Sequence, residues 1–272
     1  MQLIYSLTVC ICLCSCVNNH SKDDNDLKTE GTNKEGDTDN ILESNEYKDD
    51  KTNYINNYHK GDSLLESYYT GLLDREDLKE NVISAIEYFQ ESLLYTTDST
   101  SGLHKLAECN IILKEYDQAL TFLHICLDIS NDYNTYLLMA RAYKGVGENE
   151  ISINICDSII DTDRDTTHII ESSLLIANIY AEDFDTKAIQ YYNIVLEINP
   201  VNIKALYGKG LFYQNNQMYS EAVDVYYEIK NIDPFNLHTT FNLGFIFMEL
   251  HDYDHAINYF TDAIVSEKNY FP

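Results

Sequence analysis

The sequence predicts an all-α solenoid, built as a stack of helix–turn–helix repeats. Between Leu206 and Ala263, one pattern occurs twice with its positions in phase at a spacing of 34 residues. Small residues match small residues and aromatic residues match aromatic residues, as in the pairs Gly210 and Gly244, Tyr213 and Phe247, Tyr219 and Tyr253, Ala222 and Ala256, and Tyr226 and Phe260. Pro200 and Pro234 share the spacing of 34, and each is placed to end the second helix of a repeat.

This pattern resembles the tetratricopeptide repeat family. In the last copy the resemblance is carried by Leu243, Gly244, Phe247, Tyr253, Ala256, Phe260 and Ala263. The small residues let two antiparallel helices approach closely, and the aromatic residues fill the remaining space. The resemblance implies a right-handed superhelical solenoid of about six repeats over residues 63–270, with copies at about 63–98, 100–132, 133–168, 169–202, 203–236 and 237–270.

The earlier copies carry the same kinds of residue. Copies two to four place them at Leu106, Ala107, Tyr116, Ala119, Leu123 and Cys126, then Tyr136, Ala140, Tyr143, Ser152, Cys156 and Ile159, then Ala177, Tyr180, Ala188, Tyr192 and Val195. The first copy is weaker. It is predicted as a helix over 64–73, a long polar turn, and a helix over 82–95 around Ala85 and Phe89.

The N-terminus predicts a signal peptide over residues 1–15, because its apolar run is far shorter than the ~20 residues that span a bilayer. Leu13-Cys14-Ser15-Cys16 resembles the lipobox of bacterial lipoproteins. That resemblance implies cleavage before Cys16 and attachment of lipid to its thiol. An ordinary cleaved signal with incidental cysteines is the alternative.

Residues 16–61 predict a lipidated cysteine followed by a disordered acidic tether. Apolar residues are sparse here, so the segment buries too little surface to offset the entropy of ordering it. Ser21-Lys22-Asp23-Asp24 resembles a signal that sends some lipoproteins to the outer face of the Gram-negative outer membrane; a solvated charge run is the alternative. The expected location is thus the cell envelope, with the lipid in the outer membrane.

The charge balance narrows the class of partner. The formal net charge is −27, and such a field repels a phosphate backbone, so nucleic acid is excluded as a partner. Close contact with an anionic lipid surface is disfavoured for the same reason. We therefore expect membrane attachment through the lipid anchor only.

Motifs for catalysis are absent from the sequence, which has no glycine-rich phosphate loop, no GxSxG and no HExxH. We expect no enzyme activity, cofactor or metal. His251 and His255 are four residues apart, but His251 is predicted in the turn before a helix, which disfavours zinc. Asp161, Asp163 and Asp165 have the spacing that opens a calcium loop, although Thr166 replaces its glycine and the favoured interpretation is a solvated loop.

Three cysteines remain beyond the predicted lipid site. Cys126 and Cys156 fall on repeat positions that face the core, so we interpret them as small buried apolar residues. Cys109 and Cys126 lie on the two helices of one repeat, and a disulfide between them is the alternative outside the cytoplasm.

The resemblance also implies a binding site, because the first helices of such repeats line a groove that takes peptides or partner helices. The corresponding candidate residues here are Tyr207, Leu211, Gln214, Asn215, Phe241, Phe245, Met248, Arg141 and Asn178. The alternative is that the four large apolar residues pack between repeats or lie under a further helix. The sequence stops at Pro272, so we expect no such helix.

These observations together predict a non-catalytic cell-envelope lipoprotein. It is expected to act as an adaptor or scaffold that binds an envelope protein or peptide in its groove. The alternative function is a surface glycan-binding or nutrient-uptake component, which would bind sugar on the same aromatic residues.

Overall fold

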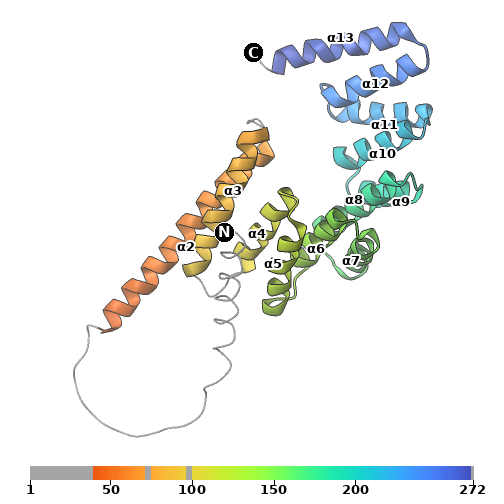
Figure 1. Cartoon of the computed structure of the whole chain (residues 1–272). Coiled ribbons are helices and arrows are strands. Elements are labelled where there is room, and N and C mark those ends of the chain that lie inside the picture. Colours follow the sequence, from red (N-terminus) through yellow and green to blue (C-terminus); the bar gives the residue numbers. More distant parts are fainter. Residues whose placement is uncertain (1–38, 71–74, 96–99, 271–272) are drawn as a thin grey trace. The chain divides into compact units, whose positions relative to one another are not determined.

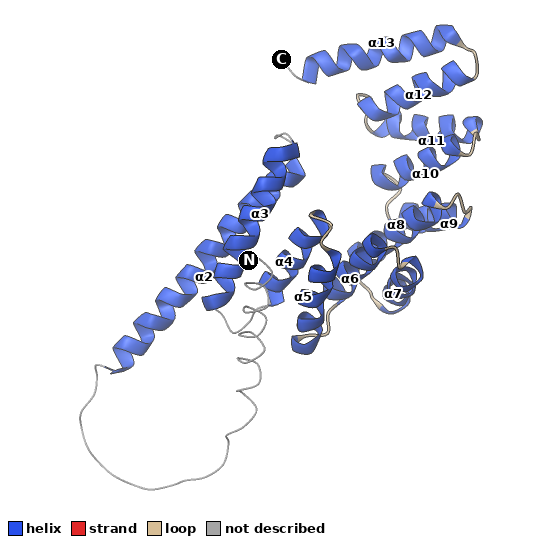
Figure 2. Ribbon diagram, in the orientation of Figure 1, coloured by secondary structure: helices blue, strands red, loops and turns tan. Residues whose placement is uncertain are grey.

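The computed structural model describes residues 39–70, 75–95 and 100–270, and throughout these ranges the regular secondary structure is helical (Figures 1 and 2). The chain divides into two units, Met1–Glu46 and Tyr47–Pro272, and the second holds the repeats. The predicted signal peptide, Cys16 and the Ser21–Asp24 segment lie outside the described residues.

The helices follow one another in antiparallel pairs. Their bounds are α2 Asp39–Thr70, α3 Arg75–Ser92 with the 3₁₀ turn η1 Leu93–Tyr95, α4 Thr100–Ile112, α5 Tyr116–Ile129, α6 Tyr133–Val146, α7 Asn149–Thr162, α8 Thr166–Glu182, α9 Lys187–Ile198, α10 Ile203–Asn215, α11 Tyr219–Ile232, α12 Leu237–Glu249 and α13 Tyr253–Tyr270. From α3 onward, each helix packs against the next one along the chain, and α4, α6 and α8 also contact the first helix of the following pair. Contacts confined to neighbouring pairs define a solenoid.

Small residues set the spacing inside each pair, as the sequence predicts. A Cβ atom built on Gly210 would lie 2.5 Å from Cε1 of Tyr226, and one on Gly244 would lie 2.9 Å from Cδ1 of Phe260. Ala222 is fully buried and Ala256 nearly so. The pairing of small with aromatic positions is therefore confirmed, because these rings occupy the space that a larger side chain would need.

Repeated local signals begin and end the first helices. Their N-terminal caps are Asp or Asn side chains, which accept hydrogen bonds from backbone N–H groups two or three residues ahead, at Asp132, Asp165, Asn202 and Asn236. From α4 onward, each turn inside a pair contains one residue with positive φ, namely Lys114, Gly147, Phe184, Gln217 and His251. This left-handed residue ends a helix and lets the chain reverse.

The first pair differs from the prediction. Residues 39–61, which we expected in the disordered tether, form most of α2, and the polar turn expected before Val82 is already part of α3. The reason is a sparse apolar face: the Tyr58 ring lies 5.5 Å from the Phe89 ring, Gly61 backs onto Phe89, and Leu65 is buried. These three positions recur at helical spacing among polar residues, so composition alone conceals them.

Candidate functional site

The predicted binding residues lie on the first helices of the last two pairs. We call Tyr207 and Leu211 of α10 and Phe241 and Phe245 of α12 the first-helix surface. Phe241 is 54 % exposed, and the other three are half-buried. Leu211 and Phe245 occupy equivalent positions 34 residues apart, as do Tyr207 and Phe241. Met248 continues the apolar character one turn further along α12 and is exposed.

Tyr207 belongs to the first-helix surface, but it also makes packing contacts inside the solenoid. Its ring lies 6.2 Å from Tyr226 and 6.2 Å from His238, and its hydroxyl accepts a hydrogen bond from Nδ2 of Asn242 at 3.2 Å. Tyr207 also packs against the core cluster that contains Leu243. The alternative considered for this residue, packing between repeats, therefore holds for much of its ring, whereas Phe241 presents its ring to solvent.

The polar candidates make contacts within the solenoid. Oε1 of Gln214 accepts a hydrogen bond from the Tyr226 hydroxyl at 2.9 Å, and Oδ1 of Asn178 accepts one from the Tyr192 hydroxyl at 2.8 Å. Burial raises the pKa of Tyr192 to about 12 and also raises that of Tyr226, so both phenols stay protonated donors at neutral pH.

Two further candidates complete the predicted set. Arg141 donates to Oε2 of Glu171 at 2.7 Å, across neighbouring first helices. Asn215 is exposed at the end of α10. Among the polar candidates, Asn215 thus has the amide most open to solvent, while the other three already have internal partners.

The histidines and aspartates considered for metal binding have local structural roles. His251 lies in the turn before α13 at φ 60°, and Nδ1 of His255 is 2.8 Å from Oδ2 of Asp252. Asp163 accepts from the backbone N–H groups of Arg164 and Asp165. Across the described part of the chain, no three His, Cys, Asp or Glu residues are grouped so that they could hold a metal ion.

The three cysteines within the described ranges are buried, free thiols. Cys109, Cys126 and Cys156 are each fully buried, which confirms the apolar interpretation of Cys126 and Cys156. Burial raises the pKa of each thiol to about 12. Since the thiolate is the reactive form, they are unsuited to act as nucleophiles.

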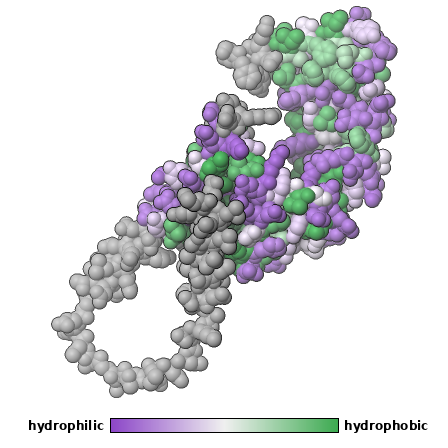
Figure 3. Space-filling model, viewed as in Figure 1, coloured by the Kyte–Doolittle hydropathy of each residue, from purple (hydrophilic) through white to green (hydrophobic). Residues whose placement is uncertain are grey.

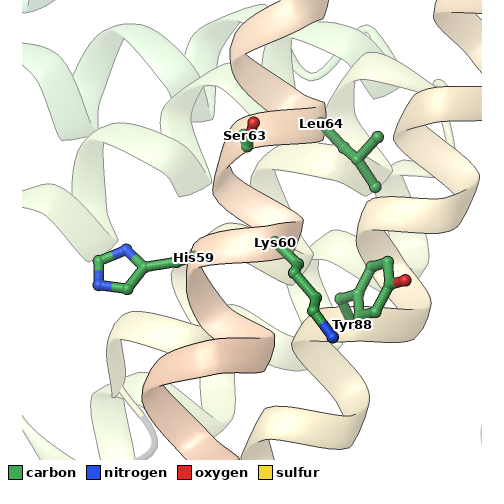
Figure 4. Close-up of a pocket in the computed structure, with 5 residues that line it drawn as sticks. All are labelled: His59, Lys60, Ser63, Leu64 and Tyr88. Carbon is green, nitrogen blue, oxygen red and sulfur yellow. The ribbon is translucent and has the colours of Figure 1, made fainter.

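A surface hollow of about 490 Å³ lies between α2 and α3 (Figure 4). His59, Lys60, Ser63 and Leu64 of α2 and Tyr88 of α3 line it. Nζ of Lys60 is 5.3 Å from the centroid of the Tyr88 ring, whereas the His59 side chain points away from that ring. Three of the five lining residues are exposed, so the hollow is an open groove between two helices rather than an enclosed pocket.

Sequence reasoning missed a histidine that joins two repeats. Nε2 of His104 on α4 is 2.7 Å from Oγ1 of Thr135 and 3.8 Å from Oδ2 of Asp132, the N-cap of α6. Burial lowers the pKa of His104, although the nearby carboxylates of Asp132 and Glu108 act in the opposite direction. The neutral ring is therefore the form that suits the fold.

This contact predicts a pH dependence of stability. A depressed folded-state pKa means that the unfolded chain binds the proton first, so stability should fall as the pH drops through about 6.5. Asp163, Asp165 and Asp252 also have lowered pKa values, but their contributions are lost only as the pH falls below about 4. Urea unfolding at pH 5, 6 and 7 should show a shallower pH dependence in His104→Gln than in the wild type. An identical dependence in both proteins would contradict this role.

The comparisons with known proteins follow this geometry. Residues 203–236, which contain α10 and α11, match the family model for the tetratricopeptide repeat. The BBSome complex member BBS4 of Bos taurus is 24% identical over 143 residues, which are 52% of this chain and 27% of that protein. The chain therefore spans about a quarter of the length of this curated relative.

Solved structures show the same fold. MamA from Desulfovibrio magneticus RS-1 superposes with a TM-score of 0.53 at 16% identity, covering 64% of this chain and 98% of MamA. A tetratricopeptide repeat protein from Parabacteroides merdae gives a TM-score of 0.52 at 15% identity, covering 76% of this chain and 80% of that one. The fold is thus an all-α solenoid of tetratricopeptide repeats. Within the described ranges, no helix has both the length and the apolar character needed to cross a bilayer.

Proposed function

We propose that this protein is a non-catalytic adaptor, which binds a protein or peptide partner on the first-helix surface of its last two repeats. Solenoids of tetratricopeptide repeats are typically platforms for protein–protein interaction, and this supports the general class. The observation that carries the finer proposal is the pair of equivalent apolar sites on α10 and α12, with Phe241 54 % exposed. Exposed apolar side chains gathered in one place often mark an interaction site.

The polar surroundings suit a peptide ligand. Asn215 offers an exposed amide beside Leu211, and both groups of an amide are able to pair with a peptide backbone. Aromatic residues also supply large contact area at a low cost in side-chain entropy. A partner would thus gain apolar contact from Phe241 and Phe245, while Asn215 satisfies polar groups at the edge.

The adaptor is further proposed to be a cell-envelope lipoprotein, held in the Gram-negative outer membrane by lipid on Cys16. The support is the sequence Leu13-Cys14-Ser15-Cys16 at the end of a short apolar run. Several acyl chains on one residue give firm attachment, because each buried CH₂ contributes about 0.8 kcal/mol.

The anchor has a direct test in Cys16→Ser. This change removes the thiol that would carry the lipid, so incorporation of a fatty-acid probe should be lost, and the protein should stay unprocessed or leave the membrane fraction. Cys14→Ser is the matched control and should keep full labelling. Equal labelling of wild type and Cys16→Ser would exclude Cys16 as the lipid site.

The adaptor function is tested by crosslinking in intact cells followed by affinity capture. Recovery of a specific envelope protein supports the proposal. Retention on a polysaccharide without any protein partner would instead support the alternative, a glycan-binding or nutrient-uptake component. The two outcomes differ in the chemistry of the captured material, so one experiment separates them.

A further inference from the structure

The last helix pair exposes a face that the preceding pair keeps covered. We call Phe241 of α12 with Ile257, Phe260 and Ile264 of α13 the end face. Their equivalents one repeat earlier are Tyr207, Val223, Tyr226 and Lys230, each 34 residues before. Tyr207, Tyr226 and Lys230 contact α12, the first helix of the next pair, and Val223 packs against the core cluster that α10, α11 and α12 share. The preceding junction therefore shows that a face of this kind can bind a helix.

Polar contacts hold α12 at that preceding junction. Nδ2 of Asn242 donates to the hydroxyls of Tyr207 at 3.2 Å and Tyr226 at 3.1 Å. Nζ of Lys230 donates to Oγ1 of Thr240 at 2.9 Å. Helix α12 therefore meets the face below it partly through hydrogen bonds.

The three polar residues that α12 contacts on the preceding pair all have apolar equivalents on the end face. Phe241 and Phe260 replace the two tyrosines, and Ile264 replaces Lys230. Phe241, Ile257 and Ile264 are 54%, 62% and 56% exposed. An exposed group of large apolar side chains is typical of an interaction site. Figure 3 shows apolar side chains gathered at the α12–α13 end.

Charge around the end face selects the kind of partner. Residues 233–270, which include α12 and α13, contain six carboxylates and a single Lys or Arg, namely Lys268; the carboxylates are Asp233, Glu249, Asp252, Asp254, Asp262 and Glu267. A second copy of this chain would bring the same acidic surroundings, and like charges across an interface are costly. A partner with basic residues beside an apolar stripe complements both features.

We propose that the end face binds an amphipathic helix of a partner protein, with an apolar stripe flanked by Lys and Arg. The helix takes the place that α12 has on the preceding pair. Its stripe covers Phe241, Ile257 and Ile264, and its cations face the surrounding carboxylates. This second site goes beyond the proposed function and shares only Phe241 with the first-helix surface.

The test uses the full chain carrying Cys16→Ser and three fluorescent synthetic 18-residue peptides. The first has a leucine stripe at helical spacing with Lys flanks, the second has Glu flanks, and the third scrambles the stripe while keeping the Lys residues. Anisotropy should show binding of the first peptide and binding at least about tenfold weaker for the other two. Ile257→Gln with Ile264→Gln should weaken the first peptide by about tenfold or more. Ile151→Gln, a change at an exposed isoleucine of α7, should leave it unaltered.

Several results would overturn the proposal. If the scrambled peptide bound as tightly as the first peptide, binding would come only from the attraction between its Lys residues and an acidic protein. An unchanged affinity in the Ile257 and Ile264 variant, with its helix content intact by circular dichroism, would place the peptide elsewhere. A wild-type dimer that this variant converts to monomer in sedimentation would make a second copy the occupant. Loss of peptide binding in Leu211→Ala with Phe245→Ala, but not in the isoleucine variant, would assign the peptide to the first-helix surface.

Discussion

Replacing Tyr226 with alanine is expected to lower the free energy of unfolding by about 3–5 kcal/mol, as for other buried aromatic residues. The side chain is fully buried between α10, α11 and α12. Its ring fills the space left by Gly210, and its hydroxyl donates to Gln214 and accepts from Asn242. Alanine would leave a cavity, would remove the partner of the Gln214 carbonyl, and would leave the Asn242 amide bonded to Tyr207 alone.

Urea unfolding followed by circular dichroism measures this loss, and two variants serve as controls. Tyr226→Phe keeps the ring and removes only the hydroxyl, so it should cost about 1–3 kcal/mol; Phe260 shows that phenylalanine fits the equivalent position. Tyr227→Ala removes the neighbouring tyrosine, which is 41% exposed, and should cost far less.

Hydrogen exchange adds the location of the damage. Because repeats are coupled mainly to their neighbours, protection should fall in α10 to α13 and persist in α4 to α7. A uniform loss of protection over all repeats would contradict a solenoid with local coupling. So would equal costs for Tyr226→Ala and Tyr227→Ala.

The double change Leu211→Ala and Phe245→Ala is expected to reduce partner capture by about tenfold or more, since central apolar anchors carry much of the energy at interfaces. Both residues are half-buried and occupy equivalent positions on neighbouring repeats. Truncating them removes apolar contact area from the first-helix surface and leaves the end-face isoleucines in place.

Leu250→Ala is the matched control, because Leu250 is 51% exposed and follows α12 in the turn rather than on the first-helix surface. It should leave capture unchanged. Loss of helix content in the double variant would show that Leu211 and Phe245 are core residues. Normal folding with undiminished capture would show that the partner binds elsewhere.

The repeat core could be predicted from the sequence because its signal is repeated. Gly210 with Tyr226 and Gly244 with Phe260 each appear as a small residue 16 positions before an aromatic one, and the structure packs each pair together. The first pair could not be predicted as well. Its face of Tyr58, Gly61 and Leu65 is interrupted by polar residues, and it becomes apparent only when Phe89 lies against it.

The sequence predicts which positions form the candidate site, but it does not predict which other side chains those residues contact. Spacing places Tyr207 and Phe241 at equivalent points, yet only the structure shows that Asn242 and His238 cover the tyrosine while Phe241 stays 54% exposed. Such differences depend on side chains from the following repeat. The bond from Tyr226 to Gln214 likewise joins two helices, and no local pattern encodes it.

Site-specific photocrosslinking at position 211 tests the adaptor function most directly. Benzoylphenylalanine in place of Leu211 would be activated in intact cells, and the same substitution at Ile151 on α7 would serve as the reference. We predict a specific protein adduct from position 211 that position 151 does not form. No protein adduct from position 211, or the same adducts from both positions, would contradict the assignment of partner binding to the first-helix surface.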